Sequence, residues 1–363
     1  MAKEFKDFTY DGKKLSSINK NYISVSFEQN EDINLAMERE MEIGSTNRYR
    51  TEPNFFYDKW SGNLSFTLCI VKNPDLYDSQ LEREITKEEI RQITRWLTSS
   101  HLPQWIKFEY ENNDNDVTNY YGYFKNIETF TVSGIVYGFR MLFECTTQFG
   151  YTDEIVKREE VSTYKNVLLK NDSDELNDYC YPTLDISPKS NGQIYFCNLS
   201  DCKLLENGIL TDSSKYFDDL LNKVDAYALT NGYKVEYSYL TETEESFNIV
   251  PLCNDTAVQF YLVDSYGIRT KCTAFFLNDT HEYRIIDGGF MFMEVYKGLD
   301  IHIDFKNLII EDSIGRMITY DKLGIYDVDN MYWTRLINGN NTFLLYGNCT
   351  FEFKYRESRK VGE

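Results

Sequence analysis

The chain has 363 residues and a formal net charge of −20, from 38 basic and 58 acidic side chains. This composition disfavours nucleic-acid binding, because a phosphate-binding groove needs clustered lysine and arginine, whereas the basic residues here are scattered among carboxylates. No apolar run approaches the ~20 residues that span a bilayer, and the N-terminus lacks the apolar segment of a signal peptide, so we expect synthesis in a cytoplasm. The length exceeds what one hydrophobic core usually holds and predicts two domains, with room for an insertion.

The aromatic and cysteine content favours a β-rich fold with buried thiols. Aromatic residues make up 16% of the chain, with 29 Tyr and 24 Phe against 6 Pro, which favours strands over helical bundles. None of the 8 cysteines forms a C-x-x-C motif, and several lie in apolar strand-like runs, so we expect free thiols rather than disulfides. Cys197 and Cys202 would make half of a metal site, but the chain has 3 histidines and no matching second pair, and we expect no metal.

The first 155 residues predict one domain that begins with a hairpin. Residues 5–27 contain two strand-like runs around the turn residues Asp11 and Gly12. Residues 28–56 are polar and nearly free of branched apolar residues, which predicts a long exposed loop, and such loops are usually functional or mobile.

A single amphipathic helix is predicted in this domain from the run TKEEIRQITRWL. Thr86 and Glu89 have capping-box spacing, and Ile90, Ile93 and Leu97 recur at helical intervals. We expect this apolar stripe to pack on a sheet, whose strands are predicted from the runs WSGNLSFTLCIVKN, WIKFEY, YYGYFKNIETF and GIVYGFRMLFECTT. Strands around one helix predict an α+β domain over residues 1–155.

The second half of the chain begins with a change in composition. Residues 156–178 are rich in charge and in Asn, Asp and Ser, which predicts a linker. Strands follow in YPTLDIS and QIYFCN, and a helix is predicted over 213–229, between a cap at Ser213 or Ser214 and a stop at Asn231-Gly232. Further strands are predicted from the runs YKVEYSYL, AVQFYLV, TAFFL, GFMFMEVY, LDIHIDF, NLIIED and RMITY.

The C-terminal run CTFEFKYR alternates strictly between apolar and polar residues. Phe351, Phe353 and Tyr355 are expected on one face of a strand, with Glu352 and Lys354 on the other. This pattern predicts a final hairpin with one buried face, and the fold class is therefore mainly β with a minor helical part (α+β).

The residues do not form a recognisable catalytic set. The sequence has no G-x-S-x-G, no H-E-x-x-H and no phosphate-binding glycine loop, and His302 alternates with Ile301 and Ile303 as a solvent-facing strand residue does. Asp300 and Asp304 would share a strand face, but glycoside hydrolysis needs two carboxyl groups on opposite sides of a cleft, which spacing alone does not show. We therefore expect no enzymatic activity, no catalytic residue and no cofactor.

The many aromatic side chains have two possible roles, packing in a core or stacking on sugar rings. Tyrosines in turn-rich stretches are the better candidates for glycan contact, and they are Tyr266, Tyr283, Tyr326 and Tyr332.

Five segments in order resemble the distal tail proteins of siphophages that infect Gram-positive bacteria. They are FTYDGKKLSS, FECTTQFGY, YPTLDIS, LDIHIDF and LINGNNTFLLYGNCTFEFKYR. Each segment is a turn with an alternating strand, so the order carries the resemblance rather than any one motif. It covers the whole chain except residues 203–297, where this sequence has nearly a hundred residues in place of the family's short connection.

The resemblance implies a fold and a domain map. Residues 1–155 would form a tail-tube-like β-sandwich with one helix, followed by the linker 156–178. Residues 179–202 and 298–363 would form a galectin-like β-sandwich that carries 203–297 as an inserted module. We expect that module to be semi-independent and to project outward, because insertions are tolerated where a surface loop has its two ends close together.

The resemblance also implies a place in the virion, at the tip of the phage tail. The protein would form a homohexameric ring, a hub between the tail tube protein and the tail-associated lysin or spike, with the tape measure protein and a receptor-binding protein as further partners. DNA would pass the lumen without specific binding. Candidates for contacts to a neighbouring subunit or ring, from residue types favoured at interfaces, are Glu38, Arg48, Tyr49 and Arg50.

Two functions remain open on the sequence alone. One is a structural assembly protein of the phage tail, and the other is a carbohydrate-binding adhesin that contacts a host cell-wall glycan. The two functions are compatible with each other in one chain.

Overall fold

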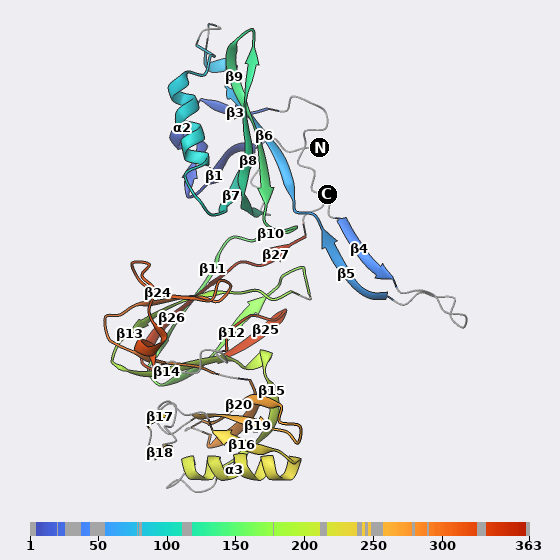
Figure 1. Ribbon diagram of the computed structural model, residues 1–363. Helices are drawn as coiled ribbons and strands as arrows, with labels where there is room; N and C mark the ends of the chain where they lie inside the picture. Colours follow the sequence, from blue (N-terminus) through green and yellow to red (C-terminus); the bar gives the residue numbers. More distant parts are fainter. Residues whose placement is uncertain are drawn as a thin grey trace, which may run out of the picture. The chain divides into compact units, whose positions relative to one another are not determined.

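The computed structural model describes residues 5–19, 21–25, 38–43, 55–77, 79, 82–110, 118–176, 178–210, 216–237, 242–243, 246–247, 257–277, 280–288, 290–324 and 332–360 (Figure 1). The chain divides into two compact units, the first formed by Met1–Asp153 with Ser358–Glu363 and the second by Glu154–Glu357. Antiparallel sheets dominate both, so the predicted mainly β fold class is confirmed.

The first unit is built on a nine-stranded sheet with the order β2-β1-β7-β8-β9-β6-β3, to which β10 and β27 are added through β8 and β10. Its strands are β1 (Phe5–Tyr10), β2 (Lys13–Lys14), β3 (Tyr22–Ser24), β6 (Ser65–Lys72), β7 (Gln104–Tyr110), β8 (Asn119–Val132), β9 (Ile135–Cys145), β10 (Gly150–Tyr151) and β27 (Ser358–Arg359). The predicted first turn is confirmed, because Asp11 and Gly12 both have positive φ angles, 51° and 70°, as a tight hairpin turn requires. A short helix α1 (Leu15–Ile18) and a 3₁₀ turn η1 (Pro74–Leu76) complete the connections.

Helix α2 (Lys87–Leu97) covers one face of this sheet (Figure 1). The predicted capping box is present, since the Thr86 hydroxyl accepts from Glu89 N at 3.3 Å and Glu89 Oε2 accepts from Thr86 N at 2.8 Å. On the buried side, the Trp96 ring stacks on Phe8 with centroids 5.5 Å apart. The predicted apolar stripe is therefore the face that packs on the sheet.

The predicted polar loop over residues 28–56 is wrong in part, because it contains strand β4 (Glu38–Ile43). β4 pairs antiparallel with β5 (Phe55–Ser61) as a separate two-stranded sheet. Backbone hydrogen bonds pair the two strands, and β4, with the sequence EREMEI, has no continuous apolar run, so hydropathy gave no sign of this strand.

The second unit contains a sandwich of two sheets, with orders β11-β26-β13-β23-β24 and β12-β25-β14-β22. Its strands are β11 (Ile155–Val161), β12 (Tyr164–Asn171), β13 (Thr183–Pro188), β14 (Gly192–Asn198), β22 (Met291–Val295), β23 (Ile301–Asp304), β24 (Ile309–Asp312), β25 (Gly339–Tyr346) and β26 (Cys349–Tyr355). Two 3₁₀ turns, η2 (Leu199–Asp201) and η3 (Tyr320–Leu323), lie in its connections.

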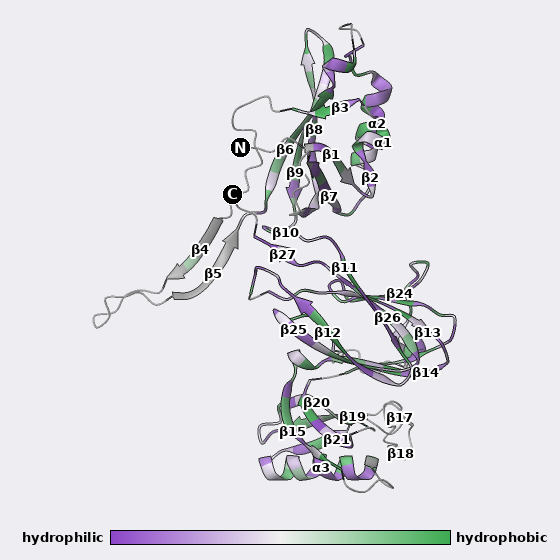
Figure 2. Ribbon diagram, turned by 180° about the vertical axis from the view of Figure 1, so that it is seen from behind, coloured by the Kyte–Doolittle hydropathy of each residue, from purple (hydrophilic) through white to green (hydrophobic). Residues whose placement is uncertain are grey.

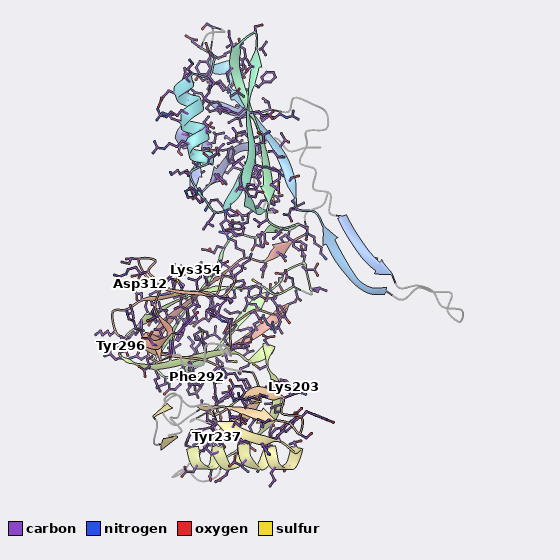
Figure 3. All side chains as sticks on the ribbon, in the orientation of Figure 1. Lys203, Tyr237, Phe292, Tyr296, Asp312 and Lys354 are labelled. Carbon is purple, nitrogen blue, oxygen red and sulfur yellow. The ribbon has the colours of Figure 1, made fainter. Side chains whose placement is uncertain are left out.

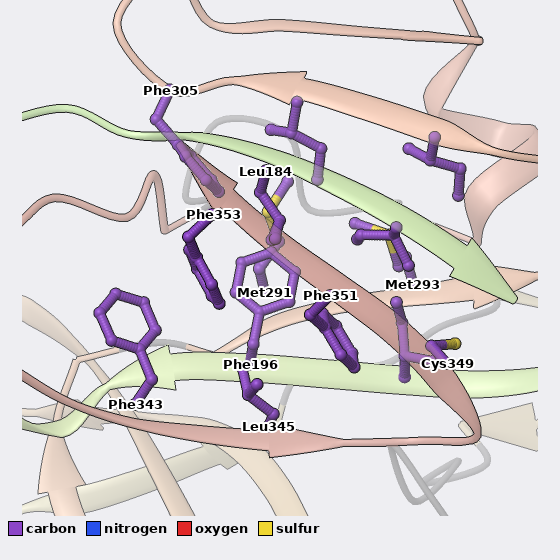
Figure 4. Close-up of a cluster of buried hydrophobic side chains, with 14 of the residues drawn as sticks. Leu184, Phe196, Met291, Met293, Phe305, Phe343, Leu345, Cys349, Phe351 and Phe353 are labelled. Carbon is purple, nitrogen blue, oxygen red and sulfur yellow. The ribbon is translucent and has the colours of Figure 1, made fainter. Parts of the chain in front are cut away.

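The sandwich core lies between these two sheets (Figure 4). The predicted final hairpin supplies part of it, since Phe351, Phe353 and Tyr355 are 0%, 0% and 6% exposed. Phe353 packs against Phe343 of β25 with ring centroids 5.0 Å apart, so the hairpin's apolar face is structural.

The predicted linker over residues 156–178 is wrong, because most of it forms the edge strands of the two sheets. β11 pairs with β26 and β12 pairs with β25, each along its full length. β12 alternates Val167 and Leu169, which are buried, with Leu168 and Lys170, which are exposed. Edge strands often carry many charged residues, because charge prevents their unpaired edge from pairing with other chains. A charged edge strand therefore has a composition similar to that of a linker.

The inserted module consists of a five-stranded sheet, β15-β21-β20-β19-β16, covered on one face by helix α3 (Tyr216–Asn231). Its strands are β15 (Lys203–Ile209), β16 (Lys234–Tyr237), β19 (Ala257–Val263), β20 (Arg269–Phe276) and β21 (Glu282–Asp287), with a separate pair β17 (Glu242–Thr243) and β18 (Ser246–Phe247). The predicted helix end is confirmed by Gly232, whose φ of 76° is the left-handed conformation common after helices. Figure 2 shows hydrophobic and hydrophilic residues interspersed along α3, whose buried residues Leu220, Val224 and Ala228 contact the sheet.

The predicted end of the inserted module at residue 297 needs correction. β22 (Met291–Val295) pairs with β14 and is the edge strand of a sandwich sheet. The apolar run GFMFMEVY resembles the strands of the module before it, so pattern alone did not reveal the change of sheet. From here on, the inserted module is residues 203–288.

Candidate functional site

The central strands β19 and β20 of the inserted module are buried on both faces, which requires a cover on each side. In β20, Ala274 and Phe276 face the cluster under α3, whereas Phe275 between them belongs to a second cluster. That second cluster also contains Ile286 of β21 and side chains of the sandwich: Tyr195, Cys197, Phe292 and Leu344. The sandwich therefore covers the second face of the module, on the side where Figure 3 labels Phe292.

This junction of the two layers is close-packed and aromatic. Tyr195 stacks on Tyr346 with centroids 4.6 Å apart and planes at 5°, and on Phe290 at 5.0 Å. Phe275 of the module reaches Phe290 with centroids 5.1 Å apart. The module thus shares a core with the sandwich, which contradicts the expectation of a semi-independent module.

Two buried polar side chains satisfy backbone carbonyls at the same junction. Gln259 Nε2 donates to Phe290 O at 2.8 Å, and Thr273 Oγ1 donates to Gly288 O at 3.0 Å. Gln259 and Thr273 are paired across β19 and β20, and they are 5% and 0% exposed. Their bonds fix the connection that leads from the module back into β22.

A buried carboxylate in η2 organises the surface beside the junction. Asp201 Oδ2 accepts hydrogen bonds from Arg335 Nε and from the Tyr332 hydroxyl, both at 2.8 Å. Burial raises the pKa of the Tyr332 hydroxyl, so this group stays protonated as a donor. The guanidinium of Arg335 also lies over the ring of Tyr179, with its central carbon 3.8 Å from the ring centroid.

Tyr179, which contacts this arginine, and Tyr181, which contacts Tyr179, flank an inward-facing residue. Cys180, between them, forms an isolated antiparallel bridge with Leu336 and packs on the sandwich core. Residues on either side of an inward-facing residue point outward, so both tyrosines are accessible, at 38% and 40%. Their ring centroids lie 6.4 Å apart with planes at 66°.

A row of charged side chains crosses the outer face of the β11-β26-β13-β23-β24 sheet. Strand pairing aligns Arg158, Glu352, Asp185, His302 and Glu311 in that order. An open hollow of ≈ 380 Å³ lies beside this row, lined by Asp185, Ser187, Asp300, His302, Glu311 and Asp312 among others. His302 is therefore a solvent-facing strand residue, as the alternation predicts.

The sequence-predicted glycan candidates have different surroundings. Tyr266 is 88% exposed in the β19–β20 turn, where Asp264 Oδ1 accepts from its backbone N at 2.8 Å. Tyr283 is 4% exposed, and its hydroxyl donates to Glu206 at 2.7 Å, while Tyr332 donates to Asp201 as described above. Tyr326 lies outside the described residues.

The structure describes one of the four predicted interface residues. Glu38 begins strand β4, whereas Arg48, Tyr49 and Arg50 lie outside the described residues. Sequence reasoning missed Tyr179, Tyr181 and Arg335, which strand pairing brings together from segments more than 150 positions apart. The alternation in YCYP, with a cysteine between two tyrosines, was the available signal.

Neither a metal centre nor a membrane-spanning helix appears in the described part of the chain. Among the residues placed by the structure, no group of His, Cys, Asp and Glu could hold a metal ion. Cys197 and Cys202 have their sulfur atoms 3.4 Å apart, with Cys197 fully buried. None of the described helices is long and apolar enough to span a bilayer.

Residues 3–147 match the protein family described as "Phage tail protein N-terminal domain". No curated protein matches the chain. Among solved structures, the Dit protein (gp 19.1) of phage SPP1, described as a paradigm of the hub adsorption apparatus in phages that infect Gram-positive bacteria, is 12% identical, with 96% of this chain and 98% of that chain covered and a TM-score of 0.45. Chains of the phage P2 baseplate in its activated conformation, one structure with Ca and one with Sr, are also similar. Each is 9% identical, with 98% of this chain and 99% of that chain covered and a TM-score of 0.42.

Proposed function

We propose, from the match of residues 3–147 to the family described as "Phage tail protein N-terminal domain", that the chain is a structural hub protein of the distal tail. In this role it joins the tail tube to the tail-associated lysin or spike and to the host-adhesion apparatus. The family match is the observation that carries the proposal, because it spans residues 3–147 of the first unit. The order of sequence segments shared with distal tail proteins supports it.

We propose further that six copies form a ring through the first unit. One face of the unit's sheet is covered by α2, and on the other face Trp105 packs against Tyr121 and Tyr151, with centroids 4.9 and 5.2 Å away. The ring contacts are proposed to include Glu38, Arg48, Tyr49 and Arg50. Arginine and tyrosine are enriched at interfaces because they combine contact area with directed hydrogen bonds.

The charge of the chain fits a channel that DNA passes without binding. At a net charge of −20 for each copy, a ring of six would carry about −120. A basic channel wall would retain the genome through counterion release, whereas like charges repel it. A computed lumen potential that is positive would contradict this part of the proposal.

The ring is tested by native mass spectrometry of the purified full-length chain and by imaging of tail tips. We expect a hexamer, and a trimer or a stable monomer in the virion would overturn the proposal. A triple replacement of Arg48, Tyr49 and Arg50 by alanine should weaken the hexamer. The matched control replaces Arg91 and Arg95 by alanine, which are exposed on α2, and it should leave the hexamer unchanged.

A second function, a carbohydrate-binding adhesin, is favoured by exposed tyrosines in the second unit. Tyr266 is 88% exposed, and Tyr179 and Tyr181 are accessible, with Tyr179 against a guanidinium. Such groups can stack on sugars. Binding of the full chain to immobilised host cell walls, compared with walls stripped of their glycans, tests this function without regard to the ring.

A further inference from the structure

Tyr179, Tyr181 and Arg335 form a corner on the surface of the sandwich. Their backbone positions are fixed by the bridge between Cys180 and Leu336, in which Cys180 N donates to Leu336 O at 3.0 Å and Leu336 N donates to Cys180 O at 2.7 Å. Leu336 is fully buried. The bridge between Cys180 and Leu336 therefore fixes the backbone from which Tyr179, Tyr181 and Arg335 point outward.

The guanidinium of this corner is held before any ligand arrives. Arg335 Nε donates to Asp201 Oδ2 at 2.8 Å, and the Asp201 side chain is 8% exposed. The same guanidinium stacks on the Tyr179 ring at 3.8 Å. Since two contacts fix its plane, the arginine loses little side-chain entropy when its remaining N–H groups meet a ligand.

The two tyrosines have different roles in such a corner. One face of the Tyr179 ring is occupied by the guanidinium, so Tyr181, 40% exposed, supplies the free aromatic face. Because the planes of the two rings lie at 66°, the Tyr179 ring stands at an angle beside the Tyr181 ring and is not coplanar with it. A flat ligand with apolar faces and polar edges suits this arrangement, because its face stacks while its edge accepts hydrogen bonds.

The charge around Arg335 indicates whether the flat ligand is neutral or anionic. The positive charge of Arg335 is balanced by Asp201, and the whole chain has a net charge of −20, so an anionic ligand gains no net attraction. A pyranose ring has C–H faces and hydroxyl edges and carries no charge. We propose that Tyr179, Tyr181 and Arg335 form a binding site for a neutral pyranose, with the sugar face on Tyr181 and its hydroxyls accepting from Arg335.

This inference deepens the adhesin function and rests on it, but it does not depend on the hub ring. It also differs from the sequence-based expectation, since none of its three residues belongs to the candidates Tyr266, Tyr283, Tyr326 and Tyr332. The site is proposed within the sandwich itself, on the segments around Cys180 and Leu336.

Saturation-transfer NMR on the full-length protein tests the site, with oligosaccharides of glucose, galactose and N-acetylglucosamine as probes and sialylated and phosphorylated sugars for comparison. We expect saturation transfer to at least one neutral probe, strongest at the C–H protons of one ring face. The Tyr179→Ala/Tyr181→Ala variant should lose at least tenfold in affinity. Transfer to none of the neutral probes, or to anionic sugars alone, overturns the proposal.

Matched variants separate loss of the site from loss of the fold. Tyr233→Ala removes a tyrosine of similar exposure, 37%, from the inserted module and should leave binding unchanged. Tyr181→Phe keeps the stacking face and should retain most of the affinity, whereas Arg335→Lys should reduce it, because lysine lacks the planar donor pair. Binding that survives the double tyrosine variant, or that falls with Tyr233→Ala instead, contradicts the assignment. Native mass measured on the same samples shows separately whether the ring proposal fails.

Discussion

The Nδ1 atom of His302 lies 2.5 Å from Oδ1 of Asp185, and Oδ2 of the same carboxylate accepts a hydrogen bond from Lys354 Nζ at 2.7 Å. These residues are neighbours on β23, β13 and β26. The hydrogen bond with Asp185 raises the pKa of His302 above its ordinary 6.5. The hydrogen bonds with His302 and then Lys354 lower the pKa of Asp185 below its ordinary 3.8, against the opposing effect of burial.

The stability of the second unit should therefore depend on pH through this pair. The His302 contribution is complete below pH 6.5 and is lost as the pH rises through its raised pKa, while the Asp185 contribution is present above pH 3.8 and is lost as the pH falls through its lowered pKa. His302→Gln should flatten the loss of stability between mildly acidic and mildly alkaline pH, by less than about 1 kcal/mol because both side chains are partly exposed. Urea denaturation at one mildly acidic and one mildly alkaline pH measures this change in the free energy of unfolding, with His101→Gln in the first unit as control. An unchanged pH dependence would rule out the pair as its source.

Phe275 at the junction is the best single test of the shared core. It is 1% exposed and belongs to the cluster that joins the module to the sandwich. Phe275→Ala should lower the free energy of unfolding by about 3–5 kcal/mol, the usual cost of a large cavity. Tyr266→Ala, 88% exposed on the same module, should change it by less than about 0.5 kcal/mol. Equal effects of the two substitutions in denaturant titrations would mean that the module does not use this face.

Two deletions test the corrected boundary of the inserted module. Replacing 203–288 by a Gly/Ser linker keeps β22 but uncovers Tyr195, Phe292 and Leu344, so we expect a folded sandwich that binds a hydrophobic dye and self-associates. Replacing 203–297 also removes β22, which pairs with β14, and should leave the second unit unfolded. Circular dichroism and dye binding distinguish the two. Identical behaviour of the two proteins would argue against the role given to β22.

The cap of α2 gives a prediction for the first unit. Thr86→Ala removes the hydroxyl that accepts from Glu89 N and should cost about 1 kcal/mol. Gln92→Ala, at an exposed position of the same helix, is the control and should be within about 0.5 kcal/mol of the unchanged protein. Denaturation followed by tryptophan fluorescence reports the difference, since Trp96 lies in the packed face of α2. Equal stability of both variants would show that the cap is not needed.

Local signals in the sequence were sufficient where one residue pattern determines one element. The capping box of α2, the Asp11-Gly12 turn and the alternation from Phe351 to Tyr355 depend on neighbours within a few positions, and the structure confirms each. These patterns need no knowledge of distant partners.

Tertiary context decided the elements that the sequence misassigned. The charges of β11 were read as a linker because an edge strand and a linker have similar compositions. The run GFMFMEVY was given to the inserted module because strand patterns do not tell which sheet a strand joins. Tyr179 and Arg335 are joined only by long-range strand pairing, and no local period contains that information.

Strand β27 changes how force passes through the molecule. The chain leaves the first unit after Asp153 and returns to it at Ser358, where β27 pairs with β10. The connection at Asp153–Glu154 is covalent, whereas the connection at Glu357–Ser358 leads to β27, which is held to the first unit by its backbone pairing with β10. Tension on the second unit therefore passes through one covalent path and one hydrogen-bonded path. A protease that cuts the first connection would leave the units joined through the β10–β27 pairing, so the C-terminal residues give the chain a second tether.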